Sequence, residues 1–100
     1  MNPQVDSLIR LALAEDIGTG DRTTLAVVPA DAIGTAHVVA KEPLVVAGGA
    51  FFARVFSLLD PRVIVAQLVA DGTEVEPGAV VLTLQGPSRA LLSGERTALN

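Results

Sequence analysis

Arg96 is the residue of this sequence whose type and neighbours best suit the binding of an anion. It follows Glu95 near the end of the chain, with Leu92 and Leu99 at i−4 and i+3 of a predicted helix. A guanidinium offers five N–H donors in a planar fork, which can bind both oxygens of a carboxylate or phosphate. An arginine beside an apolar stripe is, however, most often a surface residue that extends its charge into water. Position and type alone leave both interpretations of Arg96 open.

Two other polar groups are weaker candidates for chemistry. Glu15, Asp16 and Asp21 form an acidic cluster, but Glu15 and Asp16 point about 100° apart on a helix, and Asp beside glycine usually caps a turn. His37 is the single histidine and alternates with apolar residues, so we expect it to face solvent without a partner that sets its tautomer. We therefore predict no metal site and no catalytic residue in this sequence.

Composition narrows the classes of protein to which the chain can belong. Its 100 residues are 50% hydrophobic and 18% charged, include no Cys, and carry a net charge of −4. The lack of cysteine excludes disulfides, and scattered basic residues argue against a nucleic-acid surface. No apolar run reaches the roughly 20 residues of a membrane span, and residues 1–6 lack the basic start of a signal peptide. We expect a cytoplasmic protein that binds neither nucleic acid nor membrane, and whose apolar surface is partly covered by a partner or another domain.

Hydrophobic periodicity predicts a helix, two strands, a second helix, two or more further strands and a last helix. The predicted ranges are 3–18, 34–41, 44–47, 49–59, 63–70, 80–84 and 88–100, with a loop over 19–33. Asp71-Gly72 and Glu76-Pro77-Gly78 are turn sequences, so we expect the chain to reverse at Asp71-Gly72 and the strands to pair mainly antiparallel. The predicted fold class is α+β, a small mainly antiparallel sheet packed with helices.

The last predicted helix begins at Ser88, which we expect to cap it, and reaches Asn100 without a glycine or another stop signal. We therefore expect the polypeptide to continue beyond Asn100.

The segment from Asp71 to Gly78, followed by a Val/Leu strand, also resembles half of a biotinyl or lipoyl carrier domain. Such carriers attach their cofactor to a lysine at an exposed hairpin tip. Lys41 is the single lysine, and it precedes Glu42-Pro43 instead of occupying a hairpin of that kind. A carrier role is therefore disfavoured, although the sheet topology could be related.

Four stretches of the chain resemble the signature of quinolinate phosphoribosyltransferases, in order and at the family's spacing. They are Ala12-Leu13-Ala14-Glu15-Asp16-Ile17-Gly18-Thr19-Gly20-Asp21-Arg22-Thr23-Thr24, Lys41-Glu42-Pro43-Leu44-Val45-Val46-Ala47-Gly48, the turns from Asp71-Gly72 to Pro77-Gly78, and Leu91-Leu92-Ser93-Gly94-Glu95-Arg96-Thr97-Ala98-Leu99-Asn100. The resemblance covers essentially the whole chain. The two end motifs are specific together, whereas either alone would be moderate support.

The resemblance implies that residues 1–100 are one domain, the amino-terminal α+β sandwich (α/β-hammerhead or barrel-sandwich-like) of a pentosyltransferase whose α/β barrel is absent here. Such enzymes condense quinolinate with phosphoribosyl pyrophosphate and Mg²⁺, and release CO₂ and pyrophosphate to give nicotinate mononucleotide for NAD synthesis. They are dimers or larger assemblies in which the amino-terminal domain covers the barrel mouth of the other subunit. The family's Glu-Arg-x-x-Leu-Asn arginine binds a quinolinate carboxylate there, which implies a substrate-binding role for Arg96.

The barrel would carry the catalytic side chains, so the resemblance implies that this chain alone is inactive, holds no cofactor, and contributes substrate binding and dimerisation. Two alternatives remain open on the sequence. One is the molybdenum-transport-associated relative of the family, which shares the domain plan. The other is a stand-alone interaction or carrier-like domain.

Overall fold

The computed structural model describes residues 4, 7–11 and 22–99, and of residues 98 and 99 the backbone only. Residues 7–11 are helical, within the first predicted helix; the rest of that helix and the acidic cluster at 15, 16 and 21 lie outside the described residues. The other elements are β1 (Thr23–Val28), β2 (Ile33–Ala40), β3 (Leu44–Val45), α2 (Gly49–Leu59), β4 (Ile64–Gln67), β5 (Glu74–Val75), β6 (Val80–Pro87) and α3 (Ser88–Leu99).

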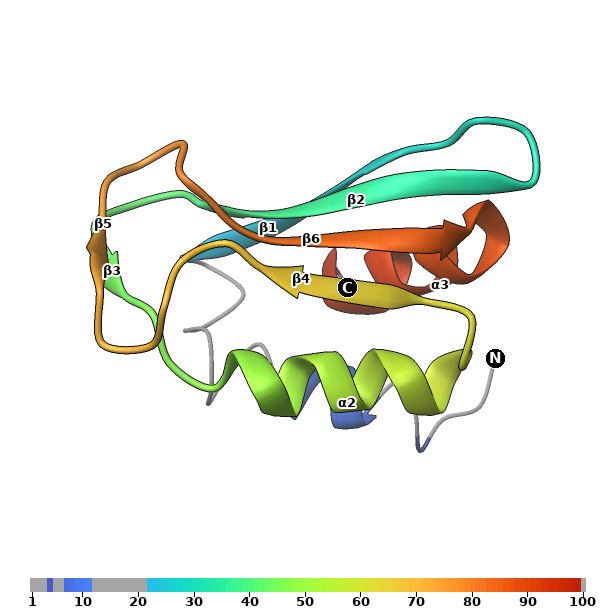
Figure 1. Ribbon diagram of the computed structural model, residues 1–100, viewed down its shortest axis with the longest axis horizontal. Helices are drawn as coiled ribbons and strands as arrows, with labels where there is room; N and C mark the ends of the chain where they lie inside the picture. The colour runs from blue at the N-terminus through green and yellow to red at the C-terminus, as the bar shows by residue number, and fades with distance from the viewer. Residues whose placement is uncertain (1–3, 5–6, 12–21, 100) are drawn as a thin grey trace.

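The strands form two sheets. A four-stranded sheet has the order β1-β2-β6-β4, and β3 pairs with β5 in a separate two-stranded sheet. Every pair is antiparallel. Figure 1 shows the β3–β5 pair at one end of the larger sheet, with α2 alongside β4 and α3 behind the strands. The predicted α+β class with a small antiparallel sheet is confirmed.

One face of the four-stranded sheet carries the core. On β2, Ala36, Val38 and Ala40 are buried and alternate with half-buried Thr35 and His37, as expected for a strand with one covered face. The buried side chains of β2 meet those of β6, because the register places Ala36 opposite Leu84 and Val38 opposite Leu82. Both helices lie against this face, α3 contacting β1, β2 and β6 and α2 contacting β4.

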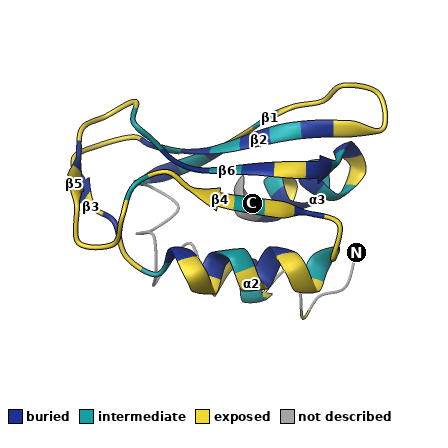
Figure 2. Ribbon diagram, viewed as in Figure 1, coloured by how far each residue is buried: buried dark blue, intermediate teal, exposed yellow. Residues whose placement is uncertain are grey.

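The helix α2 forms where the sequence predicts it. Gly48 precedes it in a left-handed conformation with φ 75°, which a glycine adopts without steric cost. Phe52, Val55 and Phe56 are buried, and the Phe52 and Phe56 ring centroids lie 5.0 Å apart. Figure 2 shows the buried positions of α2 alternating with exposed ones on its outer side. The helix ends at Leu59, before Asp60-Pro61, as predicted.

The predicted loop over residues 19–33 is wrong between residues 23 and 28, where β1 forms the outermost strand of the sheet. Thr23 and Leu25 are buried there. Pro29 and Asp31 lie after the strand, in the turn that leads to β2. In this turn the Ile33 N–H donates to the Ala30 carbonyl at 3.1 Å, and Asp31 adopts φ 47°. The chain therefore turns after the strand, not in place of it.

The reversal predicted at Asp71-Gly72 does not join two paired strands. The strand predicted over residues 63–70 is limited to β4, which pairs with β6, whereas β5 pairs with β3. Gly72 has φ 87° and donates its N–H to the Val46 carbonyl at 2.7 Å, so this turn connects the two sheets. The second predicted turn is present, with Gly78 at φ 89°.

Candidate functional site

Arg96 lies on an exposed surface in the last turn of α3. The residues on either side of it are less exposed: Glu95 is half-buried and Thr97 is buried. Since successive helical residues point about 100° apart, α3 presents the Arg96 side chain to solvent while its neighbours pack inward. The predicted neighbour Leu99 is described in its backbone only.

The helix that carries Arg96 is held along its length. At its start, Ser88 N–H donates to the Ala32 carbonyl at 2.9 Å. In its middle, Leu91 is fully buried, and Gly94 lies so close to the Phe56 ring of α2 that a Cβ there would stand 2.7 Å from Phe56 Cε1. Near its end, Thr97 is buried. The direction of the Arg96 side chain is therefore set by a packed element.

The Arg96 guanidinium has no hydrogen bond or ion pair to the residues that the structure describes. Arg62 shows the contrasting case. Its Nε lies 3.1 Å from Asp60 Oδ1 and its Nη2 2.8 Å from Asp60 Oδ2. Hydrogen bonds from the Arg62 side chain, and then from its backbone N–H, lower the pKa of Asp60 below 3.8, and that carboxylate raises the pKa of Arg62. Arg96 keeps its donors available for a ligand.

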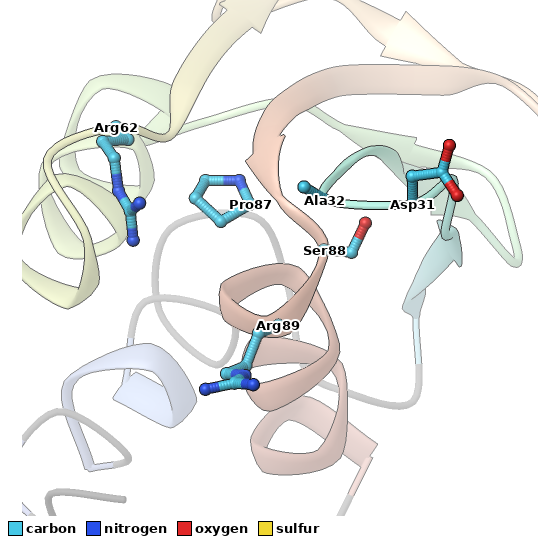
Figure 3. A pocket seen from close by; sticks show the side chains of 6 residues that line it. All are labelled: Asp31, Ala32, Arg62, Pro87, Ser88 and Arg89. Atoms are coloured by element: carbon cyan, nitrogen blue, oxygen red, sulfur yellow. The ribbon is translucent and has the colours of Figure 1, made fainter.

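A second group of polar residues surrounds the start of α3. A pocket of about 350 Å³ is lined by Asp31, Ala32, Arg62, Pro87, Ser88 and Arg89. Figure 3 shows Arg62 and Arg89 on either side of Pro87, with Asp31 on the far side of Ser88. The Arg62 charge is paired with Asp60 and Asp31 adds a negative charge, so the pocket is of mixed charge. Arg96 does not line it.

Two sequence-based expectations need correction. Ser88 does not cap α3 through its side chain, because its hydroxyl is buried without a hydrogen-bond partner in the described part of the chain. His37 does lie on the face opposite Ala36 and Val38, but it is half-buried, and its Nδ1 is enclosed without a partner among the described residues. Lys41 is exposed directly after β2.

Sequence reasoning missed one contact near Arg96. The Glu95 carboxylate accepts a hydrogen bond from the Val27 N–H, with 3.2 Å between Oε2 and N. Val27 belongs to β1, the strand that the sequence did not reveal, and the two residues lie 68 positions apart. A period-two reading of residues 23–28 would have exposed the strand, but no local pattern indicates its contact with Glu95.

The described residues contain no group of three or more His, Cys, Asp or Glu side chains placed to hold a metal ion. In the same residues, no helix is both long and apolar enough to cross a membrane.

A small antiparallel sheet with helices on one face makes this an α+β domain, and its last helix carries an arginine that has no partner among the described residues. The family model described as the amino-terminal domain of quinolinate phosphoribosyl transferase matches residues 21–100. The chain therefore belongs to the family of quinolinate phosphoribosyltransferase amino-terminal domains.

Curated relatives agree with this membership. A probable carboxylating nicotinate-nucleotide pyrophosphorylase from Synechocystis is 43% identical over 96 residues, which cover 96% of this chain and 32% of that protein. A probable enzyme of the same name from Bacillus subtilis is 40% identical over 97 residues, which cover 97% of this chain and 33% of that protein. The chain thus spans about a third of the length of these relatives.

Solved structures show the same fold. The nicotinate-nucleotide pyrophosphorylase from Francisella tularensis matches with a TM-score of 0.60 and 31% identity, over 96% of this chain and 34% of that chain. NadC from Streptococcus pyogenes matches with a TM-score of 0.62 and 32% identity, over 100% of this chain and 37% of that chain.

Proposed function

We propose that this chain is the amino-terminal domain of an enzyme that makes nicotinate mononucleotide from quinolinate and phosphoribosyl pyrophosphate, with release of CO₂ and pyrophosphate. The family match over residues 21–100 and the names of the relatives support this assignment. Because the chain spans about a third of those relatives, we assign the catalytic barrel to the remaining two thirds. Residues 1–100 form a single domain in this proposal, α3 leads toward the barrel, and the chain alone has no activity.

Arg96 binds quinolinate in this proposal. The observation that carries the role is an exposed guanidinium, without a partner in the described structure, on a helix held at both ends. Quinolinate has two carboxylates at neutral pH, and a planar fork of N–H donors can bind one of them through two parallel hydrogen bonds. A fixed donor costs little reorganisation when the ligand arrives, which favours a rigid helix over a loop as its support.

The assembly and the metal belong to the full-length enzyme. We propose a homodimer or larger homo-oligomer in the cytoplasm, in which Arg96 of one subunit reaches the active site of the other. Mg²⁺ enters with phosphoribosyl pyrophosphate, where it neutralises phosphate charge. We assign the metal's protein contacts to the barrel.

Calorimetric titration of quinolinate into the full-length protein tests the role of Arg96. We expect Arg96→Ala to weaken binding by roughly 10- to 100-fold, because a hydrogen bond to a charged group contributes about 1.5–3 kcal/mol. The matched control is Arg54→Ala, which removes an exposed arginine of α2 and should leave the affinity unchanged. Equal affinities of wild type and Arg96→Ala, with both proteins folded, would remove the proposed role.

A further inference from the structure

Glu95 precedes Arg96 and joins the second half of α3 to the edge strand β1. Its Oε2 accepts a hydrogen bond from the Val27 N–H at 3.2 Å. β1 is the outermost strand, with β2 on one side, so N–H groups on its other side lack a strand partner. A carboxylate that accepts such an N–H makes a charge-assisted bond, which is stronger than a neutral one.

The bond to Val27 complements contacts elsewhere on α3. The start of the helix is fixed by the Ser88 N–H to Ala32 carbonyl bond, and its middle by the burial of Leu91. Further along the helix, Gly94 packs against the Phe56 ring and Thr97 is buried. The hydrogen bond from the Val27 N–H to the Glu95 carboxylate joins this half of the helix to the edge strand β1, at the residue before Arg96. This bond contributes to fixing the rotation of the last turn about the helix axis.

We propose that Glu95 is a positioning residue: by holding the last turn of α3 against β1, it sets the direction in which Arg96 presents its guanidinium to the substrate carboxylate. This inference rests on the proposed function, in which Arg96 binds quinolinate. Glu95 is half-buried and directed at β1, whereas Arg96 is exposed, so Glu95 acts through the helix and not on the ligand. A bidentate contact tolerates little misalignment, since an error of about 1 Å can cost up to 100-fold.

A double-mutant cycle in the full-length protein tests this role, with quinolinate affinity as its readout. We expect Glu95→Ala to weaken binding by about tenfold in the wild-type background, because the guanidinium loses its alignment. In the Arg96→Ala background the same change should have no further effect, because no guanidinium remains to be aligned. Glu95→Gln keeps an oxygen acceptor for the Val27 N–H and should restore affinity to within about threefold of wild type.

The controls separate positioning from a general loss of stability. Glu74→Ala, at an exposed residue of β5, should leave the affinity unchanged. Thermal unfolding of each variant reports stability, and Glu95→Ala should lower the melting temperature similarly in both backgrounds. A merely structural role would give the same affinity loss in both backgrounds, which would overturn the proposal.

The cycle also distinguishes the positioning role of Glu95 from the proposal on which it rests, that Arg96 binds quinolinate. If Arg96→Ala weakens binding and Glu95→Ala does not, the positioning role fails and the role of Arg96 stands. If Arg96→Ala leaves the affinity unchanged, the substrate contact fails and the positioning role fails with it.

Discussion

Arg62 and Arg96 show two environments that this fold gives to an arginine. Arg62 follows Asp60 at the end of α2 and shares two side-chain hydrogen bonds with it, so its donors are occupied by a carboxylate of the same loop. Arg96 has no such partner in the described structure. Surface ion pairs contribute little to stability. The pair of Arg62 with Asp60 orders the chain locally at the end of α2. The free donors of Arg96 suit a ligand instead.

The Asp60–Arg62 pair gives a pH-dependent prediction. The pKa of Asp60 is lowered below 3.8 in the folded chain, first by hydrogen bonds from the Arg62 side chain and then by its backbone N–H. A lowered carboxyl pKa stabilises the fold above the unfolded value, and that stabilisation is lost as the pH falls through the lowered folded value. We therefore expect Asp60→Asn to reduce stability slightly at pH 7, and the difference from wild type to shrink between pH 4 and about pH 2.

Urea unfolding of both proteins across this pH range measures the difference. Asp31→Asn is the control, because Asp31 is exposed and forms no ion pair within the described residues. A difference between wild type and Asp60→Asn that stays constant from pH 7 to pH 2 would contradict the pairing.

At the scale of elements, α3 matters because it both closes the core and carries Arg96. Its residue Leu91 is fully buried and belongs to the same hydrophobic cluster as Leu25 of β1, Leu84 of β6 and Phe56 of α2. One helix thus packs against residues from three other elements. Within this helix, Glu95 and Thr97 are directed toward the protein, whereas Arg96 is exposed.

Leu91→Ala should destabilise the domain by about 2–5 kcal/mol, because it leaves a cavity beneath α3 that neighbouring elements can only partly fill. Chemical denaturation with a helix-sensitive signal measures this change. Leu58→Ala removes the same atoms from a leucine of α2 that is 62% exposed, and we expect an effect within about 0.5 kcal/mol. Equal destabilisation by the two substitutions would show that α3 does not close the core.

The elements also show how far the sequence predicts the fold. The apolar stripe of α2 lies between a glycine and Asp60-Pro61, so periodicity and stop signals locate it to within a residue. The prediction of a loop over 19–33 fails at β1, because Pro29 and Asp31 follow that strand and do not interrupt it. The pairings of β4 with β6 and β5 with β3 join segments distant in sequence, and turn chemistry does not specify them.

For the candidate site, the motif around Arg96 was enough to single out that residue, but not to show what supports it. The contact of Glu95 with Val27 requires β1 to lie at the edge of the sheet and α3 to pack against β1. Both are features of the tertiary structure that a local sequence pattern does not specify. The pocket at the start of α3 likewise joins two loops, at Asp31-Ala32 and at Arg62, with the junction of β6 and α3.

At the scale of the whole molecule, the face of the sheet opposite the helices remains open in the described structure. Val28, Ile33 and Ile64 lie on it and are 58%, 60% and 67% exposed. Register places them on the same face, since Val28 is opposite Thr35 and Ile64 is opposite Gln85. Exposed aliphatic side chains gathered on one face are typical of a surface that another domain or subunit covers. We expect the rest of the proposed enzyme to cover this face.

We propose that this domain acts as one part of a quinolinate phosphoribosyltransferase. The most direct measurement is of nicotinate mononucleotide and CO₂ formed from quinolinate, phosphoribosyl pyrophosphate and Mg²⁺, with the full-length protein and with residues 1–100 alone. We expect the full-length protein to form the two products in equal amounts, dependent on both substrates, and the 100-residue chain to form neither above background. Turnover by the 100-residue chain alone, or a folded full-length protein that forms no nicotinate mononucleotide, would contradict the claim.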